Sequence, residues 1–467
     1  MIELYDFQGH LTDDLRTAIC SGYSAPLLVS PCGSGKTVIF SYLTGRMSLN
    51  GLRCAIMVHR KELIDQVSNT LDDFDVPHAR VAAGEKYDPG PMVYTGSIFT
   101  AVRRLARLQP PDYVILDEAH HAIKGSTWAK CLDYWRMVNP KLRLIGVTAT
   151  PERLGGEGLK DTFDTMVIGP GTRELIDAGY LADYDIYAPP VPLDTSQLKI
   201  QAGDYKKSDA EQLVNRPSIT GSAVDHYRKY LNGRPAIAYA VSVAHAMAVA
   251  QDFRSAGFRA TTVYGAMKNH ERQEAFRDLR SGQLNLVASC DLISEGLDVP
   301  GIFGALFLRP TESYALFIQQ CGRPLRLYPG KERAIILDHV GNTARHGLPC
   351  TERTWTLEGK KRMKRKDPDD IAIRQCPYCG AVSPLAAMKC RSCGYEYPVK
   401  ARTIKEVEGE LEQIRNKERY EFKKARSTAN DLASLIEVGR MRGMNNPRGW
   451  AEHVLEARTQ KRERRLL

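Results

Sequence analysis

The sequence lacks the two features that would direct it to a membrane. No apolar run approaches the roughly 20 residues that a membrane-spanning helix needs. The longest candidate, residues 235–250, is interrupted by Ser242 and His245. The first ten residues carry Glu3 and Asp6 and no apolar core, so they do not resemble a secretory signal. We therefore expect a soluble protein with no membrane partner.

Composition and cysteine usage exclude two further classes. With 43% hydrophobic and 26% charged residues among 467, the chain can bury the cores of about three domains, which excludes wholesale disorder. Isolated cysteines are typical of buried thiols in a reducing compartment rather than of a disulfide framework, which indicates the cytoplasm. Seven of the eleven cysteines are isolated in this way: Cys20, Cys32, Cys54, Cys131, Cys290, Cys321 and Cys350.

Over most of the chain there is no excess of either charge. The first 350 residues carry 38 basic and 38 acidic side chains, whereas the chain from Thr351 onward carries 27 and 17. The net charge of +10 therefore belongs to the C-terminal quarter. A basic appendage on a balanced body favours a polyanionic partner, although a basic tail can also serve solubility alone.

A phosphate-binding loop is indicated near the N-terminus. Residues 26–30 predict a buried strand, residues 31–37 read PCGSGKT, and the apolar-periodic stretch after them predicts a helix. In this context backbone N–H groups bind phosphate, a lysine reaches the outer phosphates and a hydroxyl ligates Mg²⁺. Ser30 stands where the usual pattern has its first glycine. The expected nucleotide-binding residues are Gly33, Ser34, Gly35, Lys36 and Thr37, with Thr37 as the Mg²⁺ ligand.

A pair of carboxylates follows a second buried strand. The apolar run 113–116 ends in Asp117, Glu118, Ala119 and His120. The carboxyl ends of strands in open α/β sheets are where ligands bind. Asp117 would hold Mg²⁺, and Glu118 would orient and polarise the water that attacks the γ-phosphate. With the loop, this pair predicts hydrolysis of a nucleoside triphosphate.

These two motifs, with TATP at 148–151, resemble motifs I, II and III of superfamily-2 DEAD/DEAH-type helicases. The resemblance implies that ATP is the nucleotide. It also implies that His120, Thr148 and Thr150 couple hydrolysis to domain movement.

Further motifs of this family occur in order. Residues 58–63 and 93–97 resemble motifs Ia and Ib, and residues 4–8 resemble the N-terminal adenine-reading motif. In the last of these Gln8 matches, whereas Tyr5 and Asp6 replace an arginine and a proline. The resemblance implies that Gln8 contacts the nucleotide. It implies that the nucleic-acid backbone is contacted by His59, Arg60, Thr95 and Ser97.

The second half predicts another α/β lobe without a phosphate loop. Strands are expected at 236–240, 260–264 and 284–289, and helices at 244–256 and 271–280.

Two segments of this half, 294–298 and 319–326, resemble motifs V and VI. Arg323 and Arg326 lie one helical turn apart, so both can point into an interlobe cleft and neutralise γ-phosphate charge only when the lobes close. The resemblance implies the nucleotide contacts Gly296 and Asp298 and the catalytic residues Gln319, Arg323 and Arg326.

Two CxxC pairs, each followed by glycine, lie in the basic C-terminal part. Ten residues separate Cys379 from Cys390. Four thiolates at this spacing fit tetrahedral Zn²⁺ in a short structural ribbon with no open ligand position. Two disulfides are the alternative, which a reducing compartment disfavours. The expected zinc ligands are Cys376, Cys379, Cys390 and Cys393.

A cationic run precedes the cysteines at residues 360–366. It is either an arm that contacts phosphates or a solvated linker. The residues of the predicted arm are Lys361, Arg362, Lys364 and Arg365.

The domain organisation follows from these motifs. We predict an α/β protein with two tandem RecA-like P-loop lobes, a short zinc ribbon and a helical C-terminal tail. Residues 308–313 and 336–342 resemble the bacterial RadD-like branch, which also places cysteine pairs after the lobes. The expected boundaries are 1–180 for lobe 1, 181–215 for the crossing, 216–345 for lobe 2, 346–372 for a basic linker, 373–399 for the ribbon and 400–467 for the tail.

The resemblance implies an ATP-dependent DNA helicase or translocase in replication, recombination or repair, of bacterial or phage origin. It uses ATP, Mg²⁺ and Zn²⁺, and its ribbon or tail could recruit a replication or repair protein. Two alternatives stay open at this point: an RNA helicase, and an ATP-gated nucleic-acid-binding adaptor that separates no strands.

Overall fold

The chain comprises two compact units, residues 1–398 and 399–467, in this computed structural model. In the first unit the structure describes residues 3–122, 125–152, 158–189, 193–201, 204–214, 217–290, 301–359 and 373–397. In the second it describes 425, 429, 431–441, 446–449, 451–452 and 454–455.

Lobe 1 is built on a seven-stranded parallel sheet with the order β3-β4-β2-β5-β6-β1-β7. Its central strands are buried on both faces, as expected for continuous apolar runs in a parallel sheet. The strands are β1 (Pro26–Val29), β2 (Cys54–Val58), β3 (His78–Val81), β4 (Val93–Ser97), β5 (Tyr113–Asp117), β6 (Arg143–Thr148) and β7 (Thr165–Ile168).

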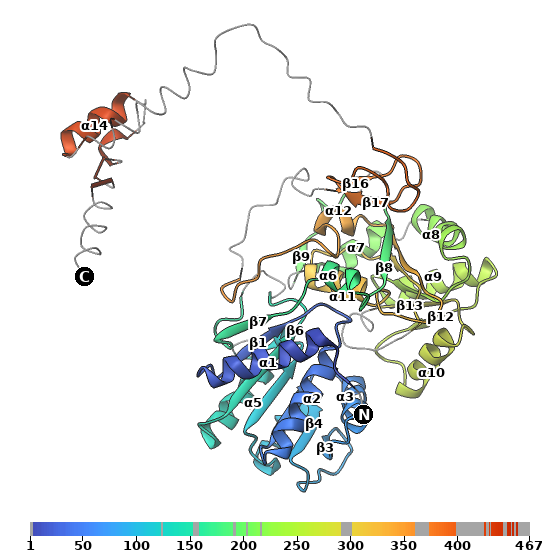
Figure 1. Ribbon diagram of the computed structural model, residues 1–467. Coiled ribbons are helices and arrows are strands. Elements are labelled where there is room, and N and C mark those ends of the chain that lie inside the picture. Colours follow the sequence, from blue (N-terminus) through green and yellow to red (C-terminus); the bar gives the residue numbers. More distant parts are fainter. Residues whose placement is uncertain are drawn as a thin grey trace. The chain divides into compact units, whose positions relative to one another are not determined.

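Helices cover both faces of this sheet (Figure 1). One face packs against α1 (Asp6–Cys20), α2 (Lys36–Leu49) and α3 (Lys61–Asp73). The other packs against α4 (Ile98–Ala101) and α5 (Thr127–Val138). Because parallel strands end at one edge, every segment that leaves a carboxyl end of this sheet faces the same side of the lobe.

Lobe 2 has a six-stranded parallel sheet with the order β12-β13-β11-β14-β15-β8. Its strands are β8 (Asp183–Tyr187), β11 (Ala236–Tyr239), β12 (Ala260–Val263), β13 (Leu286–Ser289), β14 (Gly304–Phe307) and β15 (Arg333–Asp338). Its helices include α7 (Lys207–Val214), α8 (Pro217–Tyr230), α9 (Val243–Ser255), α10 (Asn269–Arg280), α11 (Tyr314–Gly322) and α12 (Asn342–His346). The expected strands and helices of this half all form, with ends shifted by one or two residues.

The predicted crossing at 181–215 is wrong in part, because it contains a strand of the second sheet. Strand β8 pairs in parallel with β15 along its full length. Arg333 of β15 fixes this edge strand by ion pairs to Asp183 at 2.7 Å and Asp185 at 3.0 Å. The lobes are instead joined through α6 (Thr172–Asp177) and the turn after it.

A second connection between the lobes follows α12. We call residues 348–359 the strap. Its Trp355 and Leu357 pack against the α4–α5 face of lobe 1, and the Leu357 carbonyl accepts hydrogen bonds from the backbone N–H groups of Leu159 and Lys160 at 2.8 and 3.0 Å. The described start of the predicted basic linker is therefore a packed segment that returns from lobe 2 to lobe 1.

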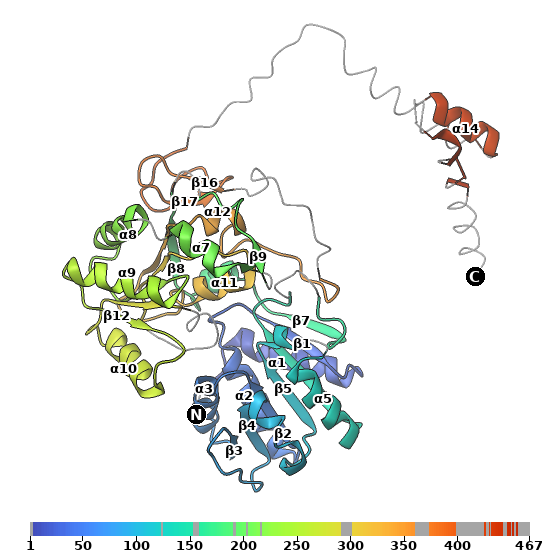
Figure 2. The ribbon, with the colours of Figure 1, turned by 180° about the vertical axis from the view of Figure 1, so that it is seen from behind.

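The cysteine segment contains the antiparallel strands β16 (Ile373–Gln375) and β17 (Val382–Pro384). It is fixed to lobe 2 beside β8 (Figure 2). The Tyr187 hydroxyl lies 2.9 Å from Ser392 Oγ, and the Tyr230 hydroxyl donates to the Cys379 carbonyl at 3.3 Å. Gln375 Nε2 donates to the Ala188 carbonyl.

The second unit contains α14 (Leu432–Met441), where a helix was expected. Its buried residues Leu435 and Val438 form a small core with Ala451 and Val454. Residues 400–424 of the predicted helical tail lie outside the described residues. Among the described residues, no helix has the length and apolar content to cross a membrane.

Candidate active site

The glycine-rich loop connects β1 to α2. Gly33 and Gly35 have φ of +88° and +79°, a conformation that side chains with a Cβ rarely adopt, and Gly35 caps α2. Lys36 is the first residue of α2, and its Nζ donates to the carbonyls of Ser30 and Pro31 at 3.1 Å each. The ammonium group therefore lies over the loop, where a bound phosphate would compete for its hydrogen bonds.

The Ser30 that replaces a glycine has a structural role in this loop. Its hydroxyl donates to Ser34 Oγ at 2.8 Å, and both side chains are buried. This hydrogen bond ties the start of the loop to its centre. Serine in place of glycine at position 30 is therefore compatible with the conformation of the phosphate-binding loop.

Gln8 reaches the loop from α1. Its Nε2 donates to the Ser34 carbonyl at 2.9 Å, and its Oε1 accepts the Tyr5 backbone N–H at 3.1 Å. A Cβ at Gly35 would lie only 2.4 Å from Gln8 Nε2, so the close approach of this side chain requires glycine. Gln8 thus contacts the phosphate-binding loop itself.

Asp117 and Glu118 lie at the carboxyl end of β5 and are only 8% and 6% exposed. Glu118 has a φ of +50°, and its N–H donates to Asp117 Oδ1 at 3.0 Å. Burial, together with the charge of Glu118, raises the pKa of Asp117 to about 6, while Lys36 acts in the opposite direction. Two crowded carboxylates are a favourable place for a divalent cation.

A hydrogen-bond network runs from these carboxylates to the end of β6. His120 Nδ1 lies 3.4 Å from Glu118 Oε2 and 3.2 Å from Thr148 Oγ1. The Thr148 hydroxyl donates to the Thr150 carbonyl at 3.0 Å. The three predicted coupling residues therefore form one buried network with Glu118.

Helix α11 of lobe 2 lies directly on the phosphate loop. A Cβ at Gly322 would lie 2.3 Å from Cys32 Cβ, and one at Gly33 would lie 3.6 Å from Arg326 Cγ. Burial raises the pKa of Cys32, and the charges of Lys36, Arg323 and Arg326 act to lower it. These three cations therefore surround a single residue of the loop. Gln319 is also buried, in the last turns of α11.

The predicted nucleic-acid contacts lie within or directly after two adjacent strands of lobe 1. His59 and Arg60 follow β2, Thr95 and Ser97 belong to β4, and Val58 pairs with Ser97. Thr95 is fully buried, so its side chain does not reach the surface of this structure. The predicted residues Gly296, Asp298, Lys361, Arg362, Lys364 and Arg365 lie outside the described residues.

A cavity of about 500 Å³ beside the start of α6 is a feature that none of the sequence motifs predicts. It lies between Thr150, the residues after β7 and the strap. The Arg353 guanidinium of the strap lies 3.4 Å from the centre of the Tyr314 ring of α11. The sequence signal was the alternation of Trp355 and Leu357 with polar residues, which predicts an extended segment with one buried face.

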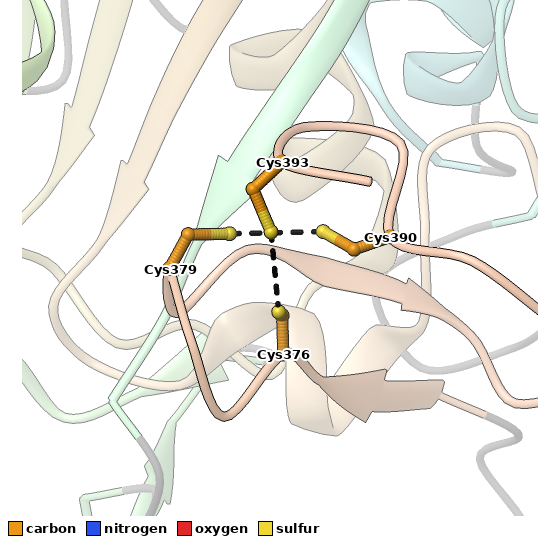
Figure 3. A group of neighbouring side chains, drawn as sticks. All are labelled: Cys376, Cys379, Cys390 and Cys393. Carbon is orange, nitrogen blue, oxygen red and sulfur yellow. Dashed lines mark hydrogen bonds between the residues drawn. The ribbon is translucent and has the colours of Figure 1, made fainter. Parts of the chain in front are cut away.

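The four cysteines of the pairs form one cluster, with their Sγ atoms within 4.8 Å of one another (Figure 3). The Sγ atoms of Cys376 and Cys393, and those of Cys379 and Cys390, are 3.6 Å apart. A tetrahedron with metal–sulfur distances of about 2.3 Å has edges of about 3.8 Å, so the donor set fits Zn²⁺. All eleven cysteines are free thiols.

The knuckle geometry also favours the thiolate form of Cys376, whereas the pKa values of Cys379 and Cys393 are raised. Gly380 and Gly394 have φ of +77° and +75°. Burial acts to raise the pKa of Cys376. Hydrogen bonds from the N–H groups of Cys379 and Tyr378 and from neighbouring cysteines outweigh burial and lower this pKa to about 7.

Comparison with known proteins gives matches over both lobes. Residues 1–153 match the family described as the res subunit of type III restriction enzymes, and residues 222–328 match the helicase conserved C-terminal domain. A 51.5 kDa protein of a Lactococcus phage (isolate 7-9) is 36% identical over 424 residues, which cover 90% of this chain and 89% of the phage protein. The protein of Saccharomyces cerevisiae named as ATP-dependent helicase IRC3 is 29% identical over 72% of this chain. The chain spans about half of that relative, 51% of its length.

Solved structures share the fold. A fragment of an HsdR subunit of a type I restriction enzyme from Vibrio vulnificus has a TM-score of 0.58 at 18% identity, over 73% of this chain and 65% of that one. Dbp5 of S. cerevisiae has a TM-score of 0.51 at 17% identity, over 72% and 84%. The predicted fold of two RecA-like lobes is thus confirmed. With the family matches and the phage relative, the chain belongs to the ATP-dependent superfamily-2 helicases, with a res-type first lobe and a helicase C-terminal second lobe.

Proposed function

We propose that this protein is a DNA-stimulated ATPase that translocates on, unwinds or remodels DNA during replication, recombination or repair. One observation carries the proposal: α11 of lobe 2, which leads into Arg323, approaches the phosphate loop of lobe 1 so closely that a Cβ at Gly322 would lie 2.3 Å from Cys32 Cβ. A site divided between two lobes makes hydrolysis depend on their closure, as a motor requires.

The proposed roles follow from the positions of the side chains. Lys36 and the loop N–H groups bind the β- and γ-phosphates. Thr37 and Asp117 would hold Mg²⁺, which would supply positive charge beside the phosphates. Glu118 accepts a proton from the attacking water, and His120 holds the Glu118 carboxylate in position. The remaining proposed nucleotide and catalytic residues are Gln8, Gly296, Asp298, Gln319, Arg323 and Arg326.

Two observations support DNA as the polymer. The family matched by lobe 1 is that of a restriction-enzyme subunit, and the similar type ISP restriction enzyme LlaBIII, with a TM-score of 0.54, is described as bound to DNA. Two relatives at 21% and 28% identity are named as RNA helicases, which makes RNA the competing polymer. The basic arm and the residues after β2 would contact the backbone without reading sequence. The resemblance to the RadD-like branch stays a prediction.

Strand displacement distinguishes a motor from an ATP-gated adaptor. We expect the protein to release a labelled strand from a forked DNA duplex when ATP is present, and not when a non-hydrolysable analogue replaces ATP. ATP-dependent binding of the fork without release of the strand would favour the adaptor instead.

We further propose that the four cysteines hold one structural Zn²⁺. Cys376→Ser should reduce the zinc content, measured by atomic emission, by about one equivalent per chain, because a three-thiol site loses a strong ligand. The lobes should still unfold cooperatively, since their cores do not include the cluster. Ser392→Ala in the same segment is the matched control and should keep its zinc. Wild-type protein with intact thiols and no metal would contradict the proposal.

The contact between Gly322 and Cys32 gives a test of lobe closure. Gly322→Ala adds a Cβ where only 2.3 Å is available, so α11 must move away from the loop. We expect ATP turnover to fall roughly tenfold or more, since an ångström-scale misplacement of catalytic groups can cost two orders of magnitude. Gly282→Ala is a matched control with no atom within 4 Å, although its φ of +75° predicts a small loss of stability. Unchanged turnover in Gly322→Ala would show that this close approach is not needed for hydrolysis.

A further inference from the structure

A second place where the lobes meet lies outside the nucleotide site. Helix α3 of lobe 1 and α10 of lobe 2 face each other across a groove of about 470 Å³. The two helices lie close together in both views (Figures 1 and 2). None of the motifs described above involves α10.

The two walls of this groove carry opposite charges. On α3 the lining residues include Glu62, Asp65 and Asp73, and on α10 they include Arg277 and Arg280. Opposite charges on facing surfaces attract, but those that are exposed to solvent are screened by salt and contribute little.

One ion pair closes the groove at its end. Arg272 of α10 donates through Nη2 to Glu62 Oε1 of α3, and the two side chains are only 13% and 18% exposed. The other terminal nitrogen, Nη1, donates to the carbonyls of Gly265 and Met267 at 3.0 Å each. The guanidinium is thus oriented by its own lobe before it meets the other, and its shielded position makes the loss of its partner costly.

The ion pair lies at the end of the lobes opposite the two chain segments that connect them. Helix α6 and the strap join the lobes at the side of β7 in lobe 1 and of β8 in lobe 2. Both strands are edge strands, and α3 and α10 pack near the opposite edges, against β3 and β4 and against β12 and β13. If the lobes turn about the tied end, a contact at the far end determines how far they open.

We propose that Glu62 and Arg272 are positioning residues that hold lobe 2 on lobe 1 in the absence of nucleotide. The pair keeps Arg323 and Arg326 near the phosphate loop before ATP binds, and the closure that hydrolysis requires then starts from this arrangement. The role of the ion pair in ATP turnover rests on the proposed function, whereas its role in holding the lobes together does not.

The test combines a structural readout with turnover. In Arg272→Met and in Glu62→Gln, we expect the nucleotide-free full-length protein to have a larger radius of gyration in small-angle X-ray scattering. We also expect roughly tenfold lower ATP turnover without nucleic acid, a fold-change that corresponds to about 1.4 kcal/mol. The charge exchange Glu62→Arg with Arg272→Glu should restore most of both properties. Arg277→Met, on the same helix but exposed and paired with Glu274 of its own lobe, should change neither.

Two results would overturn the proposal: an unchanged radius of gyration in both single variants, or single-variant losses that the charge exchange leaves unrepaired. Thermal unfolding of each variant separates a loss of the fold from a loss of closure. If the wild-type protein hydrolyses no ATP, the proposed function fails, and the scattering comparison still decides whether this pair holds the lobes together.

Discussion

Arg323→Ala is expected to lower ATP turnover on the order of 10³-fold while ATP still binds, the effect of removing an arginine finger. Arg323 is buried immediately after α11, beside the phosphate loop of the other lobe. Its charge can stabilise the transferring phosphoryl group only from the closed position, so its loss affects the transition state more than the ground state. Steady-state turnover at saturating ATP and nucleic acid measures this effect, and equilibrium binding of a fluorescent ATP analogue measures the ground state.

Arg277→Ala is the control for removing a cation from lobe 2, because Arg277 is exposed and lies on α10. Its turnover should stay within about twofold of the wild-type value. Near-normal turnover in Arg323→Ala would remove the finger assignment. A loss of ATP binding equal to the loss of turnover would instead assign Arg323 to ground-state binding.

Glu118→Gln and Lys36→Ala should fail at different steps. The amide of Gln cannot accept a proton from water, so Glu118→Gln should lose about 10²–10⁴-fold in turnover and retain ATP affinity. Lys36→Ala removes a charged donor to the phosphates, so its affinity for ATP should fall at least about tenfold, the loss of one charge-assisted hydrogen bond. Titration with a fluorescent ATP analogue and single-turnover hydrolysis separate the two steps.

The control for these variants is Lys141→Ala, an exposed lysine far along the chain from the loop. Equal loss of ATP affinity in Glu118→Gln and Lys36→Ala would contradict the separate roles. Burial raises the pKa of Asp117 to about 6, so the two carboxylates influence each other. For this reason Glu118, and not Asp117, is the residue to replace. A change at Asp117 would alter both the proposed cation ligand and the charge beside Glu118.

Much of the fold and the nucleotide site could be predicted because their signals are local. The apolar runs around Pro26–Val29 and Tyr113–Asp117 lead directly into the loop and the carboxylates. Strand, turn and helix are therefore specified by adjacent residues, and the parallel sheet then brings their carboxyl ends to one edge. The four cysteines were predictable for the same reason, since each pair forms its knuckle locally.

What the sequence did not indicate depends on contacts between distant residues. The segment that forms strand β8 falls within the expected crossing because the residues around it have mixed character and prolines at 189, 190 and 192 follow it. Only pairing with Arg333 explains the charges of Asp183 and Asp185. The strap was read as linker because the side chains that bury Trp355 belong to lobe 1. The ion pair of Glu62 with Arg272 spans 210 residues, and nothing in either local sequence indicates a partner.

The rate of ATP hydrolysis against a panel of nucleic acids tests the central claim most directly. The panel contains single-stranded DNA, forked DNA, duplex DNA and single-stranded RNA, each at saturating concentration with Mg²⁺ and ATP. We predict a low rate without polymer and stimulation by single-stranded or forked DNA that exceeds stimulation by RNA. Stimulation by RNA alone would assign RNA, and not DNA, as the polymer. A protein that hydrolyses no ATP with any of these polymers would contradict the account.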